Sequence, residues 1–315
     1  MNLVRPAAPA GRFIAAFAGL SGLLWAFLFA PPLAALEQSE TVTRSFTLAA
    51  VSGQRTLVVD NVSGSIDIEA ASGDTVQLTL KQTYIARNAA EMARARQEVV
   101  LEVTENPGRL ELVQGGPWRC RSRDKARHGD CCCGHDDRGD RRYEVRFDWT
   151  LKVPKNLDLE VDNVNEGAIR IAGVAGRLDV DHVNDDVTLV RVAGEIDART
   201  VNGELKVDFA ALPAGDCRFG TVNGDIELAF PRGLGAELSF ATLNGEVFTD
   251  FPFELGKLPP TSARSKSGGR NHHQMGGNTA HHHETGGKTA AIIGGGGIDL
   301  ACETVNGDIT IRERS

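Results

Sequence analysis

A short pattern of apolar and polar residues repeats every 18 to 21 residues between positions 157 and 249. It is clearest in TVNGDIEL and TLNGEVFT, returns as TVNGDITI near the C-terminus, and occurs less perfectly as DNVSGSIDI near the start. Each copy has one central apolar residue, taken here as position zero: Val62, Val164, Val183, Val201, Val222, Leu243 and Val305. Self-similarity at this period indicates stacked supersecondary units.

Two short alternating segments flank each centre. Positions −5 and −3 and positions +4 and +6 are apolar in the copies, with Thr249 as the one exception, and the second copy carries one extra residue, Glu166. Two period-2 strands around an Asn-Gly turn are typical of β-structure. We therefore predict an all-β chain, a β-solenoid of about seven coils of 18–21 residues, stacked about 4.8 Å apart in chain order.

Stacking puts equivalent residues in rows. We expect an asparagine ladder at one corner, beside glycines that accept positive φ: Asn165, Asn184, Asn202, Asn223, Asn244 and Asn306. We expect an outward threonine row of Thr200, Thr221, Thr242 and Thr304, with His182 as a solvated residue in the same row. An acidic row would follow, open to a calcium interpretation: Asp186, Glu204, Asp225, Glu246 and Asp308.

The N-terminus predicts export. Arg5 and Arg12 precede an apolar run from 13 to 30, and PPLAALEQSE follows, as in a secretory signal cleaved near Ala34 or Ala35. An uncleaved anchor is the alternative, and a membrane would then be contacted only through this segment. We assign residues 1–36 to the signal peptide or anchor and place the mature chain in the periplasm, on the cell surface or among secreted proteins.

The remaining boundaries follow from the repeats: a first coil at 37–69, an insertion at 70–156, repeats at 157–250, a second insertion at 251–296 and a final coil at 297–315. The first insertion predicts a strand in VQLTLKQTYIA, a helix in RNAAEMARARQEV, a hairpin turning at Asn106–Gly108 and a strand in YEVRFDWTLKVP. These would form a small antiparallel sheet plus short helix, beside or capping the solenoid. The second insertion, rich in Gly and His, predicts a mobile loop.

Both insertions leave from the connection between position +6 and the next −5. They should therefore emerge along one side, and insertions on one face of repeat proteins often form the binding surface. The net charge of −8 speaks against nucleic acid as a partner. The segment around residues 119–142, in contrast, holds eight Arg and Lys residues, and it could attract an anionic polymer or glycan.

The cysteines and histidines leave two interpretations open. In an exported chain, Cys120 pairing with one of Cys131, Cys132 or Cys133 would close a loop. The same cysteines with His128 and His135 could instead hold zinc or copper, although their spacing matches no standard finger. A weaker metal affinity is expected of the histidines in the second insertion: His272, His273, His281, His282 and His283.

Cys217 and Cys302 occupy inward positions. With the Leu243 coil between theirs, the two coils would lie nearly 10 Å apart, beyond the reach of a disulfide. We therefore predict two unbridged core cysteines.

We expect no enzyme and no cofactor. The chain has no G-x-S-x-G, no H-E-x-x-H and no phosphate-binding glycine loop. Asp179, Asp181, Asp185 and Asp186 could supply a carboxylate pair like that of a glycan-cleaving enzyme, but their spacing fits solvent-facing strand positions equally well.

The TVNGDI and TLNGEV repeats and the glycine-rich approach to the final TVNGDITI resemble the bacterial putative-adhesin family of unknown function, over about residues 45–315. The resemblance implies a right-handed β-solenoid on exported or envelope proteins, with no catalytic residues to carry over. The leading hypothesis is an exported, non-enzymatic envelope scaffold or binding protein that acts through loops projecting from one side, with an envelope protein or an anionic polymer or glycan as partner. The alternatives are an exported metal-binding module and a carbohydrate-active β-helix enzyme.

Overall fold

The computed structural model describes residues 35–48, 53–119, 143–256 and 289–314. Within these ranges the chain is predominantly β, as predicted, with a single helix and two mixed sheets. In spatial order, the ten-stranded sheet contains β1 (Leu36–Thr47), β4 (Thr75–Ala86), β7 (Tyr143–Pro154), β3 (Ile66–Ala71), β9 (Ile169–Ala172), β11 (Val187–Val192), β13 (Leu205–Phe209), β15 (Ile226–Phe230), β21 (Ile309–Glu313) and β17 (Val247–Thr249). The eleven-stranded sheet contains β18 (Phe253–Gly256), β19 (Thr289–Ile293), β16 (Ala236–Ala241), β20 (Ile298–Glu303), β14 (Cys217–Gly220), β12 (Ile196–Arg199), β10 (Leu178–His182), β8 (Asp158–Asn163), β2 (Thr56–Asp60), β6 (Arg109–Gly115) and β5 (Val100–Asn106).

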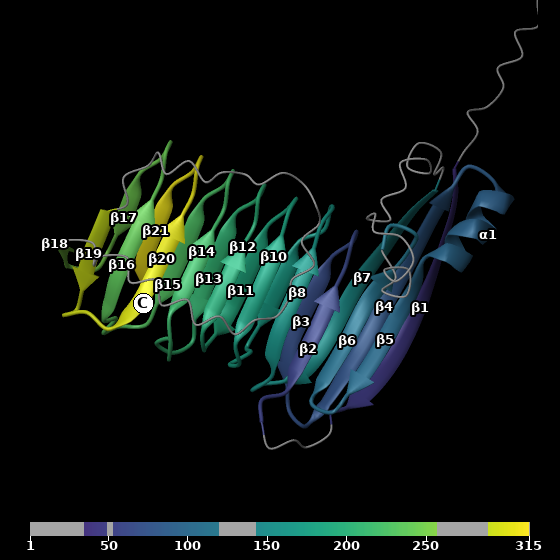
Figure 1. Ribbon diagram of the computed structural model, residues 1–315, viewed down its shortest axis with the longest axis horizontal. Helices are drawn as coiled ribbons and strands as arrows, with labels where there is room; N and C mark the ends of the chain where they lie inside the picture. The colour runs from purple at the N-terminus through teal and green to yellow at the C-terminus, as the bar shows by residue number, and fades with distance from the viewer. Residues whose placement is uncertain (1–34, 49–52, 120–142, 257–288, 315) are drawn as a thin grey trace, which may run out of the picture. The chain divides into compact units, whose positions relative to one another are not determined.

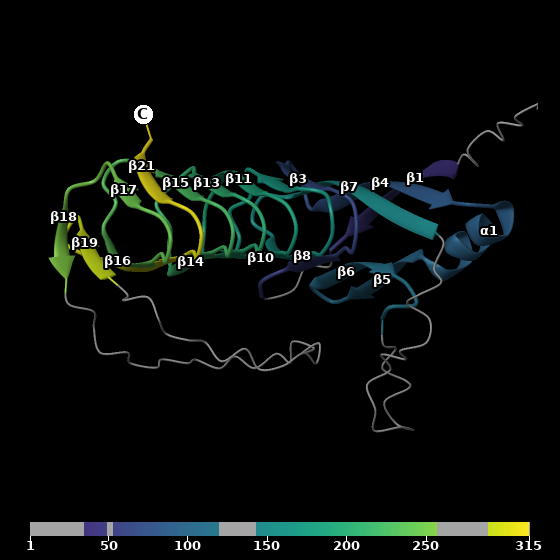
Figure 2. The same ribbon diagram turned by 90° about the horizontal axis from the view of Figure 1, so that it is seen from above.

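Each sequence repeat forms one unit of two strands. The residues before position zero form a strand of the eleven-stranded sheet, and the residues after it form a strand of the ten-stranded sheet, so the two sheets face each other (Figure 2). Equivalent strands of neighbouring units pair in parallel, for example Leu205 with Ile226 and Val207 with Leu228. The alternating inward residues of both sheets are buried and build one continuous apolar core.

Two edges of the stack follow from this winding. The short turns at positions 0 to +3, where the chain passes from the eleven-stranded to the ten-stranded sheet, lie along one edge, here called the turn edge. The connections that return from the ten-stranded sheet to the next unit lie along the opposite edge, here called the connector edge.

The final repeat is not at the end of the stack. β20 lies between β14 and β16, and β21 lies between β15 and β17 (Figure 1). The predicted chain order of the coils is therefore wrong at this point. The exchange is possible because the registers are equivalent: Leu300 pairs with Cys217 on one side and with Leu238 on the other. The far side of β16 is occupied by β19, which runs antiparallel to it.

The first insertion does not form a sheet of its own. Its strands β4 and β7, its helix α1 (Ala89–Glu98) and its hairpin β5–β6 occur where predicted. However, β6 pairs in parallel with β2, and β7 pairs in parallel with β3, so both sheets continue through the insertion. Leu110 and Leu112 then match Leu57 and Val59, which makes β6–β7 an eighth unit of the stack.

Further elements complete the two ends. β1, which the repeat pattern did not predict, pairs with β4 over its whole length. The side chain of Asn88 caps α1 by accepting from the backbone N of Glu91 at 2.9 Å, and Met92 and Ala95 are buried as α1 packs on β4 and β7. The second insertion, predicted as a loop, contributes β18 and β19 in the described part of the chain. No helix in the described ranges is long and apolar enough to cross a bilayer.

Candidate binding edge

Five asparagine side chains form a hydrogen-bonded ladder along the turn edge. At position +1, each Nδ2 donates to the Oδ1 of the neighbouring unit: Asn202 to Asn184 at 3.0 Å, Asn223 to Asn202 at 2.8 Å, Asn306 to Asn223 at 2.7 Å and Asn244 to Asn306 at 2.8 Å. The predicted ladder is confirmed for these residues. Asn165 departs from it, because Glu166 lengthens its turn and the Asn184 amide bonds to Val164 O instead.

A column of apolar side chains runs beside the asparagines. The residues at position zero are 36–41% exposed in five consecutive units, and the end unit presents Leu243 at 60%. These five are Val164, Val183, Val201, Val222 and Val305. Since five neighbouring units present an apolar side chain beside a ladder asparagine, this part of the turn edge is a regular array of exposed apolar groups and amides, whose spacing is that of the strands, about 4.8 Å.

The row at position −1 is buried, which overturns two predictions. Thr200, Thr221 and Thr304 are 4–6% exposed, and each Oγ1 donates to a backbone carbonyl of the neighbouring unit at 3.1–3.2 Å. These three threonines therefore do not face outward, and Thr242, which is part-buried in the end unit, donates in the same way to Gly307 O at 3.1 Å. A buried hydroxyl can occupy this place because the adjacent carbonyl accepts its hydrogen bond.

His182 occupies the same row and is 3% exposed, so it is not the solvated residue that we predicted. Its Nδ1 lies 3.0 Å from Asn163 O, an acceptor, so Nδ1 carries the proton. Its Nε2 is buried with no hydrogen-bond partner in the described structure. Burial lowers the pKa of His182, against the opposing effect of the Asn163 carbonyl.

The same row continues into the first units with amide side chains. Asn61 and Asn163 are 0–2% exposed, and Asn61 Nδ2 donates to Asn163 Oδ1 at 3.2 Å. In the eighth unit, Gln114 Oε1 accepts from Val62 N at 2.8 Å and from Ser63 N at 3.2 Å. The Gln114 side chain thus bonds to the turn of the neighbouring unit at Val62 and Ser63. After β6, a long segment follows in place of the short turn that other units have.

The acidic row has partners within the chain. Asp186 accepts from Glu204 N at 2.7 Å, Asp225 accepts from Asp308 N and Asp308 accepts from Glu246 N, each at 2.8 Å. Backbone N–H groups of adjacent units thus stabilise these stacked carboxylates. In the described ranges, no group of three or more His, Cys, Asp or Glu residues is arranged to hold a metal ion.

Glycine at position +2 allows the turns to approach each other closely. A Cβ on Gly224 would lie 1.9 Å from Gly203 O, and one on Gly307 would lie 2.0 Å from Gly224 O. Contacts this short are impossible, so the glycines are needed for the stacking distance itself. Positive φ, the predicted reason for these glycines, is therefore only part of the reason.

The two long segments both meet the turn edge. β6 ends there, and residues 120–142 follow. β18 runs antiparallel to β19, and β19 runs antiparallel to β16, so Gly256 and Thr289 also lie at this edge of the eleven-stranded sheet. Both insertions begin at the connector edge, after β3 and after β17, as predicted, whereas the described ends of the two long segments within them lie at the turn edge.

The predicted metal and disulfide residues lie outside the described residues. These are Cys120, His128, Cys131, Cys132, Cys133 and His135 in one segment and His272, His273, His281, His282 and His283 in the other. Both core cysteines are free and buried, as predicted. The predicted reason, a unit lying between the two cysteines, was wrong, because β14 and β20 are direct neighbours. Cys302 pairs with Phe219 and not with Cys217. Burial raises the pKa of the Cys217 thiol to about 11.

The four candidate catalytic aspartates do not face one another across a cleft. Asp179 and Asp181 lie on the outer face of β10, and burial, followed by Asp181 and Asp197, raises the pKa of Asp179. Asp185 and Asp186 lie in the turn, where their carboxylates accept backbone N–H groups. This arrangement holds turns together and offers no acid and base around a shared substrate position.

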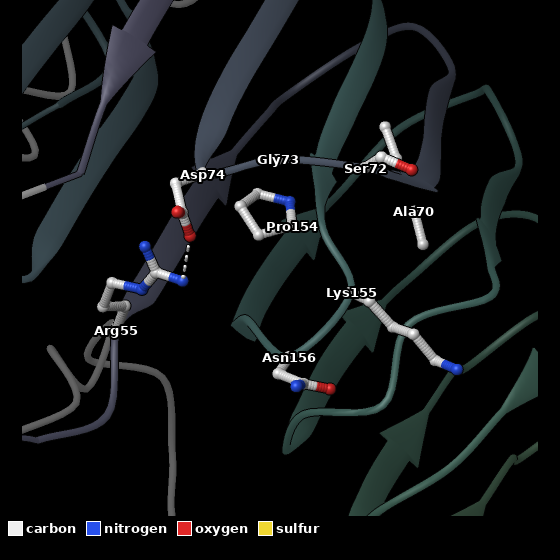
Figure 3. Close-up of a pocket in the computed structure, with 9 residues that line it drawn as sticks. Arg55, Ala70, Ser72, Gly73, Asp74, Pro154, Lys155 and Asn156 are labelled. Atoms are coloured by element: carbon white, nitrogen blue, oxygen red, sulfur yellow. Dashed lines mark hydrogen bonds and ion pairs between the residues drawn. The ribbon is translucent and has the colours of Figure 1, made fainter.

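A shallow polar cavity of about 470 Å³ lies at the connector edge (Figure 3). Arg55 precedes β2, residues 70–74 form the β3–β4 turn, and residues 154–156 link β7 to β8. The guanidinium of Arg55 is held by Asp74 at 3.0 Å, while Lys155 points away from this pair. The titratable groups of its lining are Arg55, Asp74 and Lys155, and the carboxylate of Asp74 is engaged by Arg55.

Comparisons with known proteins do not assign a family. No protein-family model and no curated protein matches the chain. Among solved structures, a putative cell adhesion protein from Clostridium sporogenes is 12% identical, with a TM-score of 0.41 over 88% of this chain and 100% of that one. A putative adhesin from Bacteroides fragilis is 10% identical, with a TM-score of 0.37 over 87% and 97%.

A putative lipid binding protein from Parabacteroides distasonis is 12% identical, with a TM-score of 0.26 over 87% of this chain and 97% of that one. TM-scores below 0.5 do not establish a common fold, and no conclusion about this chain is drawn from these three likenesses. The resemblance to the putative-adhesin family stays a prediction.

Proposed function

We propose that the chain is an exported, non-enzymatic β-solenoid that acts as an adhesin-like binding protein of the cell envelope, with the turn edge as its binding face. The solenoid interpretation is supported by the parallel pairing of equivalent strands and by the alternation of successive strands between two sheets. Export is supported by the basic and apolar start of the sequence.

One observation carries the binding role. Along consecutive units, the turn edge exposes an apolar side chain and an amide whose orientation is set by its neighbour in the ladder. An array that is ordered before binding does not lose side-chain entropy when a partner binds. Repetition along the edge suits a long partner, because each unit can make the same contact with successive parts of it.

The chemistry near one end of this edge favours an anionic polymer or glycan. Arg119 lies at the end of β6, where its guanidinium bonds to Asp60, and further basic residues follow it in the sequence. The basic residues can attract an acidic chain, whereas the Arg119 charge is paired with Asp60 and the carboxylates at position +3 of the turn edge repel anionic groups. Hydroxyl groups of a sugar can use the remaining amide hydrogen-bonding capacity along the array.

The test uses the turn edge and a matched control at the connector edge. Val201→Asn with Val222→Asn removes apolar surface from the array, and Leu212→Asn changes a side chain of similar exposure, 42%, in the β13–β14 connection. Binding of the purified chain to a panel of anionic and neutral polysaccharides is measured by co-sedimentation. We expect the double variant to bind at least about tenfold more weakly and Leu212→Asn to bind like the original. Equal losses, or no binding by the original chain, would contradict the proposal.

The two alternatives are separable by direct measurement. A metal-binding module would retain zinc or copper after purification, whereas a disulfide-closed segment would leave fewer free thiols than the six cysteines of the sequence. A carbohydrate-active enzyme would produce new reducing or unsaturated ends from the same polysaccharide panel. Either result would replace the proposed binding role as the leading function.

A further inference from the structure

The C-terminal end of the stack exposes an unusual amount of apolar surface. The four most exposed large apolar side chains of the described residues all lie within thirteen positions of one another: Leu243 at 60%, Phe248 at 48%, Phe253 at 50% and Leu255 at 75%. They belong to the last unit and to β18, which follows it. We call the surface formed by β17 and β18 the free end.

Two of these side chains point in the direction of the core. Phe253 pairs with Ile293 and Leu255 pairs with Ala291, and both partners are buried, at 1% and 3% exposure. Directly opposite residues of antiparallel strands lie on the same face of the sheet. Phe253 and Leu255 are therefore core-facing residues that remain exposed because, in the described part of the chain, no further element covers them.

The free end also presents unpaired strand edges. β17 is the last strand of the ten-stranded sheet and β18 is the last strand of the eleven-stranded sheet, each with a single described neighbour (Figure 1). Exposed edge strands with apolar side chains promote pairing with another chain, and repeat proteins need a polar cap to prevent it.

The opposite end of the stack also has two edge strands with one described neighbour each, β1 and β5, but a helix packs against it. There, α1 packs on β4 and β7 and buries Met92 and Ala95, while its Arg94 and Arg96 are bonded to Glu98 and Glu40 at the surface. Figure 2 shows the helix beside these strands, at the end remote from β18. Head-to-tail stacking of two copies would require this helix to be displaced.

The chain's own second insertion is a poor cover for the free end. Residues 257–288 follow β18 directly, but they contain only two large apolar residues, Leu258 and Met275, among many glycines, histidines and polar residues. Such a composition cannot supply a row of apolar side chains to face Phe253 and Leu255.

We propose that the free end is a self-association surface, at which two copies of this chain pair tail to tail. Core-facing apolar residues between two sheets are best matched by another end of the same two-layered stack. Within one chain, β20–β21 already pairs in this way with a unit on either side. A two-fold axis along the strands would place β17 of each copy beside β18 of the other, antiparallel, so that the β18–β19 overhang of each copy covers the overhang of the other and both sheets continue across the dimer. Such a dimer carries two turn edges, which would raise the avidity for a polymeric partner.

The test measures association of the full exported chain in EDTA, which removes metal bridging through the histidines. Sedimentation velocity across a concentration series is compared for the original chain, Phe253→Lys, Leu255→Lys and a matched control, Leu212→Lys, which adds the same charge at an exposed leucine elsewhere. We expect a monomer–dimer equilibrium for the original chain and Leu212→Lys. Each free-end variant should raise the dissociation constant by at least about tenfold, with an unchanged thermal unfolding midpoint at concentrations where both chains are monomeric.

Hydrogen exchange locates the interface independently. The amides of residues 247–256 should become better protected as the concentration of the original chain rises, and Leu255→Lys should abolish this change. A chain that stays monomeric at every concentration, a dimer insensitive to both free-end variants, or association that grows into open polymers would each overturn the proposal. These outcomes leave the polysaccharide-binding test unaffected, because that test depends on the turn edge.

Discussion

At the scale of single residues, the buried polar row at position −1 shows how turns of different sequence are held in the same way. Thr200, Thr221 and Thr304 donate a hydroxyl to a carbonyl of the next unit, while Asn163 uses its amide for the same purpose at Gly64 O. The row satisfies backbone carbonyls that the turns would otherwise bury without partners.

Thr221→Val tests the contribution of this row. The substitution keeps the volume but leaves Gly203 O without the hydroxyl that donates to it at 3.1 Å. We expect a loss of about 1–3 kcal/mol in the free energy of unfolding, measured by urea denaturation. Thr221→Ser retains the donor and should lose less. An equal loss in both variants would show that packing of the methyl group, and not the hydrogen bond, matters here.

His182 makes stability depend on pH. Because burial lowers its pKa in the folded chain below the ordinary value of 6.5, the unfolded chain binds a proton more readily than the folded one. Its contribution to stability is therefore complete above about pH 6.5 and is lost as the pH falls below this value. Asp185 and Asp186, which raise the pKa, oppose the effect.

His182→Thr provides the comparison, since threonine occupies this row in other units. We expect the free energy of unfolding of the original chain to fall more steeply between pH 7 and 5 than that of the variant, as measured by chemical denaturation at each pH. Parallel pH profiles would mean that His182 keeps its ordinary pKa in the folded chain.

At the scale of the elements, stacking of the turns depends on how closely the backbones approach. Where Gly224 faces Gly203 O and Gly307 faces Gly224 O, there is no room for a side chain. Asp185 takes the equivalent place in one unit, where its carboxylate accepts from Gly167 N at 3.1 Å. Glycine is thus required by most neighbouring pairs of units but not by all of them.

Gly224→Ala should therefore be strongly destabilising. Its Cβ would lie 1.9 Å from a backbone carbonyl oxygen, and relief requires the two units to separate. We expect a cost above about 3 kcal/mol, seen as a lower unfolding midpoint in thermal and urea denaturation. Gly53→Ala, where nothing lies within 4 Å, is the control and should change little. Similar midpoints for both variants would refute the role of close approach.

At the scale of the whole stack, the C-terminal unit holds its two neighbours together. Arg312 pairs with Glu227 at 2.6 Å, and Glu313 N donates to Asp250 at 3.2 Å, so the unit is bonded to the chain on both sides. The end unit, β16–β17, is consequently joined to the rest of the stack through residues that come last in the sequence.

Leu300→Ala tests this arrangement. Leu300 is fully buried, and we expect the substitution to cost about 2–5 kcal/mol. Hydrogen exchange followed by mass spectrometry should show faster exchange in both β14 and β16. With the coils in chain order, β14 would not contact the altered unit, so unchanged exchange in β14 would contradict the observed strand order. Leu238→Ala in β16 is the control, because β14 is not its direct neighbour.

The sequence alone determined the strands of the repeats, their inward residues and the asparagine ladder from Asn184 onward. The period-2 pattern in LKVDF identifies Leu205, Val207 and Phe209 as core residues, since successive side chains of a strand must point to opposite faces. Equal spacing of the repeats then places Asn202 beside Asn223. These features are local, or they follow from one repeat distance, and a linear pattern contains both.

Only the tertiary structure decided which units are neighbours, which polar residues are buried and which end is open. Equivalent registers let the final unit fit at more than one place in the stack, so its position depends on β19 occupying the far side of β16. The burial of His182 and Thr221 depends on carbonyl groups supplied by adjacent turns, and the exposure of Leu255 depends on the lack of a following unit in the described structure. These are contacts between segments distant in sequence, and the pattern within one repeat cannot specify them.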